Sequence, residues 1–326
     1  MNDMAEKPQL LKVVDLTKDY STRSGVHVTA LPGVSMTLED GEFVSVVGPS
    51  GCGKTTLLKI LAGIIQPTSG QVLYRGRHIT GAQRGMGVVF QSPVLMPWLK
   101  IIDNVLLPAK VIGLDRTAAR ATAMELLELV GLGGFENKYP FELSGGMQQR
   151  ASIVRSLVHD PAILLMDEPF GALDPITRTH LQDELLSIQA GIRKTIVFVT
   201  HDIDEAVRLG DRIAIFAEDG TLAQRATARE LLTSPATPFV ESFVGAERAL
   251  LLLAVTPVDR SMLSPVPPHT HSSPPDLPVI ALGTPLRDAL ALMVLHGAEA
   301  LAVTATAEQR EVIGVLPAAA LATLRP

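Results

Sequence analysis

A glycine-rich segment at residues 48–56 constrains this chain more than any other part of its sequence. It fits the pattern G-x-x-x-x-G-K-[ST], which is typical of a loop that wraps around phosphate groups. Residues 42–47 predict a strand before it and residues 55–62 a helix after it, which is the context such a loop requires. The glycines leave room for backbone N–H groups to face a phosphate, and the helix N-terminus adds partial positive charge. The alternative, a turn that binds nothing, is disfavoured by the Lys-Thr ending.

Several side chains of this phosphate loop have predictable roles. Lys54 can reach the β- and γ-phosphates of a nucleotide, and the Thr55 hydroxyl suits Mg²⁺. Cys52 lies near both Lys54 and a helix N-terminus, so we expect its thiolate to be favoured, although we assign the thiol no chemical role. The residues of this loop that we expect to contact nucleotide are Gly48, Ser50, Gly51, Cys52, Gly53, Lys54, Thr55 and Thr56.

Composition limits the remaining possibilities. A chain of 326 residues with 47 % apolar residues can build one large or two modest domains. The net charge of −6 argues against a general nucleic-acid binder, and a single cysteine leaves no disulfide framework and indicates a reducing compartment. Residues 1–9 are polar and do not resemble a secretory signal. The longest apolar run, residues 249–255, is far shorter than the roughly 20 residues that span a bilayer, so a membrane role requires a partner chain.

Upstream of the loop, residues 10–16 predict a first strand. Tyr20 follows that strand, and aromatic residues are scarce in this chain, so Tyr20 is a candidate platform for stacking on an adenine base. A half-buried tyrosine at the end of a strand is an equally good interpretation of its position.

Downstream, residues 85–90 predict a buried strand that ends at Gln91, and residues 92–160 predict a helical insertion. Helical spacing is followed by Ala119, Ala123, Leu126, Leu127 and Val130, with Gly131 as the stop.

A further helix is predicted to open at residues 143–150, a segment that we call the signature segment. Its Gly145 and Gly146 would expose N–H donors at the helix start and form a second anion site, although such a pattern is also typical of an ordinary turn with an N-cap. The apolar stripe of this helix consists of Met147, Ala151, Val154 and Val158.

Two carboxylates follow an apolar strand predicted at residues 163–166. A buried strand that delivers Asp167 at its C-terminal end is suited to hold Mg²⁺, and Glu168 is then a candidate base for an attacking water. Taken alone, two acids after a strand more often mark a helix start. The upstream phosphate loop favours the functional interpretation.

The next predicted elements are a turn at residues 171–174, a helix at 176–189 and a strand at 195–200 that ends at His201. A lone histidine is usually structural, but this one lies at the C-terminal end of a strand, where open α/β sheets bind ligands. Residues 213–217 are predicted to be the last strand of this core, followed by a turn at 219–220.

In this order, these motifs resemble the ATP-binding subunit of ABC transporters over residues 10–245. The resemblance implies an α/β fold, with a P-loop NTPase core and a helical subdomain at about 92–160. It implies ATP and Mg²⁺ as ligands, with Tyr20 as the adenine platform. Thr55, Gln91 and Asp167 would hold or sense the metal, Glu168 would be the catalytic base, and His201 the switch histidine that acts with Gln91. Contacts across a dimer would come from Ser144, Gly145, Gly146, Gln148 and Asp174.

One phosphate loop and one signature segment do not complete the family's site within a single chain. The resemblance therefore implies a homodimer or heterodimer of ATPase subunits that closes around ATP and drives membrane permease subunits. A solute-binding protein acts indirectly, no nucleic acid is involved, and the ATPase is peripheral to the cytoplasmic face of the membrane.

The clues to the transported solute conflict. Residues 96–99 with 103–105 resemble importers of nitrate, sulfonates, taurine or thiamine precursors, whereas residues 200–206 and 243–248 resemble importers of glycine betaine and choline. Two other classes remain as alternatives. An exporter ATPase is disfavoured by the region after Gln91. A soluble ABC ATPase of DNA repair or translation is also disfavoured, because such proteins usually have zinc cysteines, long coiled coils or two cassettes, and this sequence shows none of these.

The C-terminal part is predicted to be separate from an ATP-binding domain at 1–250. Residues 251–276 predict a linker, and 277–326 have a β-α-β-β order that resembles a single cystathionine-β-synthase-type (CBS) repeat. The family's adenosine-binding hydroxyl and carboxylate are replaced by Pro317 and Ala320, so we expect a packing or dimerisation module rather than a sensor.

Overall fold

The computed structural model describes residues 9–21, 27–171, 173–265, 277–306 and 311–321. The chain divides into two compact units, Met1–Arg225 and Ala226–Pro326.

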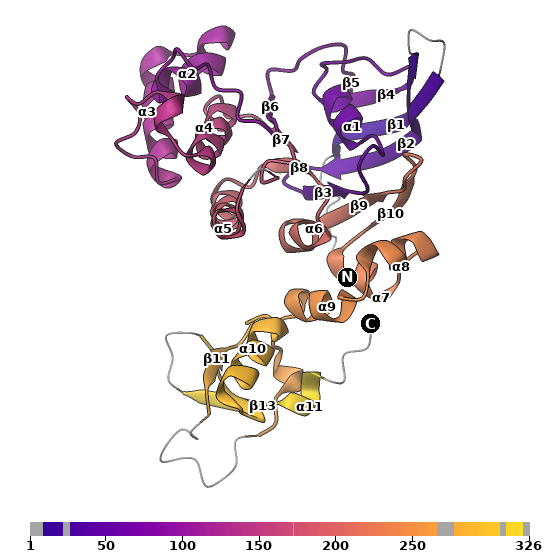
Figure 1. Ribbon diagram of the computed structural model, residues 1–326, viewed down its shortest axis with the longest axis vertical. Helices are drawn as coiled ribbons and strands as arrows, with labels where there is room; N and C mark the ends of the chain where they lie inside the picture. The colour runs from indigo at the N-terminus through magenta and orange to yellow at the C-terminus, as the bar shows by residue number, and fades with distance from the viewer. Residues whose placement is uncertain (1–8, 22–26, 172, 266–276, 307–310, 322–326) are drawn as a thin grey trace. The chain divides into compact units, whose positions relative to one another are not determined.

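Two β-sheets form the frame of the first unit (Figure 1). A four-stranded sheet has the order β2-β1-β4-β5 and a six-stranded sheet the order β10-β9-β3-β8-β7-β6. Strand β3 pairs in parallel with β8 and β9, and β7 pairs in parallel with β6 and β8. The strands are β1 (Gln9–Ser21), β2 (His27–Glu39), β3 (Phe43–Val47), β4 (Ser69–Tyr74), β5 (Arg77–His78), β6 (Met86–Val89), β7 (Ile163–Asp167), β8 (Thr195–Thr200), β9 (Arg212–Phe216) and β10 (Leu222–Ala226).

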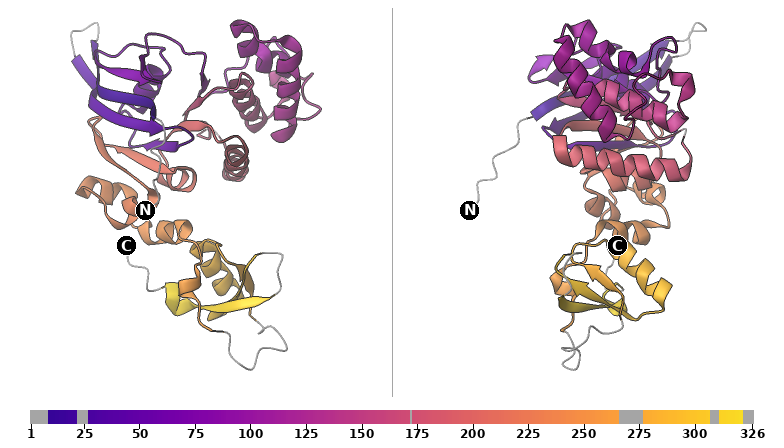
Figure 2. Two further views of the ribbon diagram at one scale, coloured as in Figure 1. Left: turned by 180° about the vertical axis from the view of Figure 1, so that it is seen from behind. Right: turned by 90° about the vertical axis from the view of Figure 1, so that its left-hand side faces the viewer.

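The helices of the first unit cover both faces of the parallel strands. Helix α1 lies between the two sheets, whereas α2, α3 and α4 gather as a separate group, as the views of Figures 1 and 2 agree. These three helices lie at residues 101–157, within the stretch 92–160 where a helical insertion is expected. The helices are α1 (Lys54–Leu61), α2 (Ile101–Ile112), α3 (Arg116–Leu129), the short 3-10 helix η1 (Pro140–Glu142), α4 (Gly145–Leu157), α5 (Pro175–Ile192) and α6 (Ile203–Leu209).

Alternation along the central strands divides the core into two clusters. On β8, Val197 and Val199 pack with α1 and the four-stranded sheet, whereas Ile196 and Phe198 pack with the other helices. The same alternation places Leu165 of β7 on the α1 side. Because parallel strands point the same way, the C-terminal ends of β3, β6, β7 and β8 all open at one edge of the sheet.

The sheet continues one strand further than the sequence predicts. Residues 213–217 are not the last strand, because Gly220 adopts a positive φ of 83° and turns the chain back into β10, at the edge of the sheet. Strand β10 was missed because its Leu-Ala-Gln-Arg-Ala sequence shows neither an apolar run nor strict alternation.

The second unit begins with helices and ends with a small sheet. Its three strands have the order β11-β12-β13, with β11 parallel and β13 antiparallel to β12. A core that includes Leu286, Met293 and Leu301 joins helix α10 to these strands. The elements are α7 (Ala228–Thr233), α8 (Pro238–Val244), α9 (Arg248–Val255), η2 (Arg260–Met262), β11 (Val279–Ala281), α10 (Leu286–His296), β12 (Ala300–Thr304), β13 (Val312–Pro317) and α11 (Ala318–Leu321).

The stretch 251–276, expected to be a linker, differs from that prediction over its described part. Leu251 and Leu252 are buried in α9, and Val258 belongs to the core of the second unit. Ser264 pairs with Val315 in an antiparallel bridge, so this stretch adds to the small sheet. Proline and serine around 261–273 indicated a linker, but the apolar residues before them are what the fold buries. Residues 266–276 lie outside the described part.

Candidate nucleotide site

The phosphate loop connects β3 to α1 at the shared edge of the parallel strands. Gly53 precedes the helix in the left-handed region, with φ 93°, and a Cβ at this position would clash with the carbonyl oxygen of Ala30. Glycine is therefore required here for backbone angle and for space. The Lys54 side chain is buried, and its Nζ donates to the carbonyls of Gly48 and Pro49 at 2.7 and 2.9 Å. The predicted strand–loop–helix context is present.

The cysteine of the loop corrects one expectation. Cys52 is fully buried, and desolvation raises the pKa of its thiol, although the Lys54 charge acts in the opposite direction. Burial outweighs the nearby cation, so the thiol form is favoured and the expected thiolate is not. The sequence indicated the charge correctly but gave no measure of the burial.

A hydroxyl and a carboxylate meet beside the loop, from residues 112 positions apart. Thr55 Oγ1 donates to Asp167 Oδ1 at 3.1 Å. Burial raises the pKa of Asp167, whereas the Thr55 hydrogen bond lowers it. This pair, a buried Asp167 carboxylate beside an exposed Thr55 hydroxyl, fits Mg²⁺, which proteins hold through one or two carboxylates together with substrate phosphates. The described residues contain no group of three or more His, Cys, Asp or Glu side chains arranged around a metal.

The two predicted catalytic side chains are also neighbours. Glu168 Oε2 lies 3.2 Å from His201 Nδ1, and these residues follow the adjacent strands β7 and β8. The Glu168 backbone is held in the left-handed region at φ 44°, and its N–H donates to the carbonyl of Val199. About 22 % of the Glu168 side chain is exposed, so water can reach the carboxylate.

Gln91 and the Glu168 carboxylate both lie close to Gly171. A Cβ built on Gly171 would lie 3.7 Å from both Gln91 Nε2 and Glu168 Oε2, so the loop after β6 and the loop after β7 face each other across Gly171. The structure thus brings Gln91, Glu168 and His201 to the edge that also holds the phosphate loop.

Tyr20 lies beside the start of α1. Its hydroxyl is 3.5 Å from Thr56 Oγ1, the Lys18 ammonium lies 5.3 Å from the ring centroid, and 41 % of the residue is exposed. Tyr20 is therefore a partly exposed tyrosine near the end of β1 and beside the phosphate loop, a placement that fits both interpretations of its position.

The signature segment lies in the helical group. Ser144 caps α4, its Oγ accepting from the Met147 N–H, and a Cβ at Gly145 would meet nothing within 4 Å. Helix α1 and helix α4 lie apart in both Figure 1 and Figure 2, so the fold does not bring this segment to the phosphate loop of the same chain.

Two predicted contact residues have local partners. Gln148 Nε2 donates to the carbonyls of Pro140 and Leu143, so its amide fixes the turn before α4 and is not directed outward. Asp174 caps α5 by accepting from the N–H groups of Ile176 and Thr177, and its hydrogen bonds with Thr177 lower the pKa of its carboxyl.

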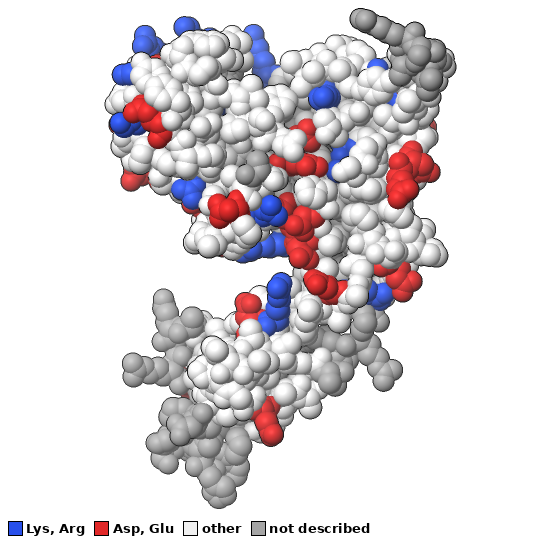
Figure 3. Space-filling model, in the orientation of Figure 1, with Lys and Arg blue, Asp and Glu red and all other residues white. Residues whose placement is uncertain are grey.

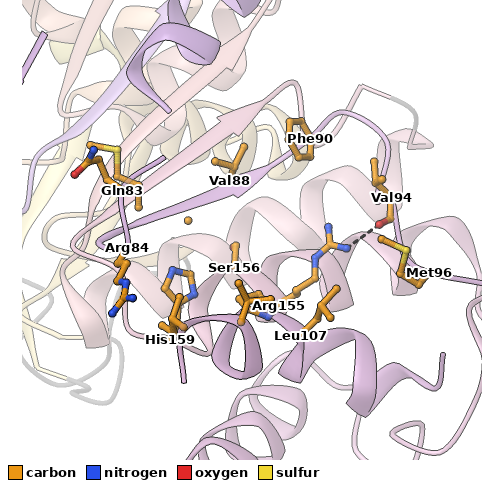
Figure 4. Close-up of a pocket in the computed structure, with 15 residues that line it drawn as sticks. Gln83, Arg84, Val88, Phe90, Val94, Met96, Leu107, Arg155, Ser156 and His159 are labelled. Carbon is orange, nitrogen blue, oxygen red and sulfur yellow. Dashed lines mark hydrogen bonds between the residues drawn. The ribbon is translucent and has the colours of Figure 1, made fainter. Parts of the chain in front are cut away.

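Sequence reasoning missed a groove of about 430 Å³ between β6, α2 and α4 (Figure 4). Arg155 donates to the carbonyls of Pro93 and Val94, which fastens the loop after Gln91 to α4. Asn104 is fully buried. Its Oδ1 accepts from the Met96 backbone N–H, and its Nδ2 donates to the Met96 carbonyl. No local sequence motif predicts the groove, because its walls come from three separate stretches, at residues 83–96, 107–112 and 155–159. The Asn104 bonds give the residues that resembled nitrate-type importers a role in shaping this loop.

The family model for ABC transporters matches residues 31–171. The osmoprotectant import ATP-binding protein OsmV of Salmonella typhimurium is 39 % identical over 302 residues, covering 90 % of this chain and 76 % of that protein. This chain is an ABC transporter ATP-binding subunit. It therefore belongs to the ATPases whose hydrolysis is coupled to transport.

Other relatives agree on the family and differ in solute. The spermidine/putrescine import ATP-binding protein PotA of Acidothermus cellulolyticus is 42 % identical over 276 residues, covering 79 % of this chain and 72 % of that protein. A solved structure, the dimeric post-hydrolysis state of an ATP-binding cassette bound to ADP and Pi, is 34 % identical with a TM-score of 0.61. It matches 67 % of this chain and 99 % of that one.

Across the described residues, none of the helices combines the length and the apolarity needed to cross a bilayer.

Proposed function

We propose that this chain is the ATP-hydrolysing subunit of an importer for osmoprotectants of the glycine betaine, choline and carnitine type. The observation that carries the ATPase part is the convergence of Lys54, Asp167, Glu168 and His201 at one edge of the parallel sheet. The OsmV relative supports the solute, because its match covers 90 % of this chain and so extends into the second unit. The two relatives named above are importers of osmoprotectants and of polyamines, and neither is named for nitrate, sulfonates or taurine.

The geometry suggests a role for each side chain. Lys54 and the N–H groups of the loop would bind the β- and γ-phosphates, and Tyr20 would stack on the adenine. Thr55 and Asp167 would hold Mg²⁺, with Gln91 close by, and the metal supplies charge neutralisation at the phosphates. Glu168 would take a proton from the attacking water, while His201 Nδ1, at 3.2 Å, keeps that carboxylate in place.

The active form is proposed to be a dimer. Within one chain the signature segment and the phosphate loop are apart, and Gly145 is open to the outside. A second copy could bring its Ser144, Gly145 and Gly146 to the nucleotide held by the first. Asp174 would lie at that contact.

Membrane permease subunits are the proposed partners at the groove of Figure 4, at the cytoplasmic face of the membrane. The groove borders the loop after Gln91, so a docked permease segment would act directly on a residue of the ATP site.

Nucleic acid is not among the proposed partners. Basic and acidic side chains are interspersed on the face drawn in Figure 3, unlike the single basic patch expected of a nucleic-acid binder.

Uptake measurements test the transport proposal. In cells whose only copy carries Lys54→Ala, we expect loss of ATP-driven uptake of labelled glycine betaine, choline or carnitine. Taurine, nitrate and spermidine uptake should be unchanged, and the exposed Lys12→Ala should behave like the wild type. Loss of spermidine or taurine uptake instead would contradict the solute class. Solute accumulation in the variant cells would indicate an exporter.

The second unit is proposed to contain a single CBS-like repeat from residue 277 onward that packs or dimerises and does not sense adenine nucleotides. The β-α-β-β order is present, with Gly314 buried against Leu263. Pro317 and Ala320 offer no hydroxyl or carboxylate to a ribose.

Calorimetry on the full chain tests this proposal. In the Lys54→Ala background, where the phosphate loop is disabled, we expect no heat of binding for AMP up to millimolar concentration. A micromolar dissociation constant that disappears when Pro317 is changed would make the second unit a sensor.

A further inference from the structure

A buried carboxylate lies directly behind His201. Glu205, on α6, is 7 % exposed. Its Oε2 accepts from Thr200 Oγ1 at 2.6 Å, and its Oε1 accepts from Gln182 Nε2 of α5 at 3.1 Å. A charged group this deep requires partners, and both oxygens of the carboxylate have one.

Thr200 connects this carboxylate to the backbone on both sides of His201. Its hydroxyl donates its only proton to Glu205 and accepts from the Asp202 N–H at 3.1 Å. The residue before His201 and the residue after it are thereby held by one oxygen atom. The orientation of Thr200 is in turn set by Glu205, so the carboxylate determines the turn that presents the imidazole.

Arg178 of α5 faces the same network from the other side. Its Nε lies 3.8 Å from Glu205 Oε1 and its Nη1 lies 3.7 Å from Asp202 Oδ2. Its Nη2 donates at 3.4 Å to the carbonyl of Leu173, in the loop that follows Glu168. The guanidinium therefore touches the loops after β7 and β8 at once. Its Nε atom is buried and makes no hydrogen bond, so one donor of the guanidinium stays unpaired although carboxylate oxygens lie nearby.

We propose that Arg178, acting through Glu205 and Thr200, is a positioning residue that sets His201 against Glu168 and links that pair to the Leu173 backbone. The inference rests on the proposed function, in which His201 orients the catalytic carboxylate and Asp174, next to Leu173, meets a second subunit. A shift of Leu173 on dimer closure would reach His201 through the Leu173 carbonyl and the Arg178 guanidinium.

The electrostatics agree with this role. Burial raises the pKa of the Glu205 carboxyl, and the Thr200 hydrogen bond and the Arg178 charge both lower it. Without the guanidinium, protonation of Glu205 becomes easier. A protonated Glu205 no longer requires the Thr200 proton, and the hydroxyl is then free to turn away from the Asp202 N–H.

A double-mutant cycle tests the proposal. We expect Arg178→Ala to lower the kcat for ATP roughly 10-fold, within the range of coupling seen for residues of one network. The KM for ATP should remain within about twofold, because the phosphate loop is untouched. In a His201→Ala background, the same substitution should have little further effect. An equal loss of kcat in both backgrounds would show that Arg178 acts independently of His201, and no loss in either would overturn the proposal.

Matched variants separate positioning from stability. Thr200→Ser keeps the hydroxyl and should retain most of the activity, whereas the isosteric Thr200→Val removes both hydrogen bonds and should lose activity as Arg178→Ala does. Arg208→Ala is the control, because Arg208 bonds the far side of Gln182 and an exposed Asp183. A loss of kcat in this control equal to that of Arg178→Ala would contradict the proposal, since general weakening of α5 would then explain both.

The cycle also distinguishes failure of the proposed function. If His201→Ala alone retains the wild-type kcat, His201 does not orient Glu168 and the proposed function is wrong at that residue. If His201→Ala lowers kcat and Arg178→Ala does not, only the further inference is overturned. Thermal unfolding of each variant identifies any that fail to fold. About 30 % of the Arg178 side chain is exposed, so its replacement disturbs the core less than replacement of the buried Thr200.

Discussion

Replacement of Glu168 by glutamine is expected to lower ATP turnover roughly 10²–10⁴-fold while ATP binding is retained. The amide is nearly isosteric with the carboxylate and can still bond His201 Nδ1, which lies 3.2 Å from Glu168 Oε2. It cannot accept the proton of an attacking water. The phosphate loop and the Thr55–Asp167 pair are unchanged, so the nucleotide should still bind. Steady-state ATP turnover and equilibrium binding of a fluorescent ATP analogue measure the two effects.

The same variant should accumulate as an ATP-bound dimer, because the step that opens the dimer is blocked. Gel filtration with and without ATP would detect it. Asp183→Asn is a suitable control, since this exposed carboxylate pairs with Arg208 on the outside of α5. Turnover in Glu168→Gln equal to that of the wild type would remove Glu168 as the base, and Asp167 would then be the next carboxylate to examine.

Much of the parallel core could be predicted because its strands are continuous apolar runs. The predicted strands at 42–47, 163–166 and 195–200 correspond closely to β3, β7 and β8, all fully buried. Buried parallel strands have this composition since both faces are covered. The polar residues at the C-terminal ends of these strands, such as Asp167, Glu168 and His201, could therefore be placed once the strands were predicted.

The four-stranded sheet was largely missed, and β2 shows why. It contains Pro32 and Gly33, which normally argue against a strand. The structure places β2 at the edge of its sheet, where a missing N–H is tolerated, and gives Gly33 a φ of 108°. The strand is therefore defined by its place in the sheet, which a local pattern does not contain.

Long-range contacts at the site were equally beyond local pattern. The clash that a side chain at Gly53 would make with Ala30 depends on β2, and the burial that raises the pKa of Cys52 depends on both sheets. Motif spacing identified residues that the fold brings to one edge of the sheet, among them Lys54, Asp167 and Glu168. It did not identify that Arg178 and Glu205 lie behind His201, because a network between an arginine and a buried carboxylate has no fixed sequence spacing.

The dimer makes a sharper prediction through two complementary variants. Lys54→Ala should disable the phosphate loop of its own chain. Gly145→Asp should disable the signature segment, since the position is open in the monomer and the new carboxylate would face the phosphates held by a second copy. At a separation of roughly 4 Å and an effective dielectric constant of about 20, two unit charges repel by about 4 kcal/mol, which corresponds to about a thousandfold loss of turnover. ATP binding to the Gly145→Asp monomer should be unaffected.

Neither variant alone should hydrolyse ATP at an appreciable rate, but a heterodimer of the two contains one intact pair. That pair joins the phosphate loop of the Gly145→Asp chain to the signature segment of the Lys54→Ala chain. Heterodimers isolated with two different affinity tags should therefore regain ATP hydrolysis. The matched control is a heterodimer of wild type with the Lys54→Ala/Gly145→Asp double variant, which carries the same substitutions but no intact pair, and it should stay inactive. If the control were the active heterodimer and the complementary one inactive, the phosphate loop and the signature segment would have to act within one chain, and the composite site would be wrong.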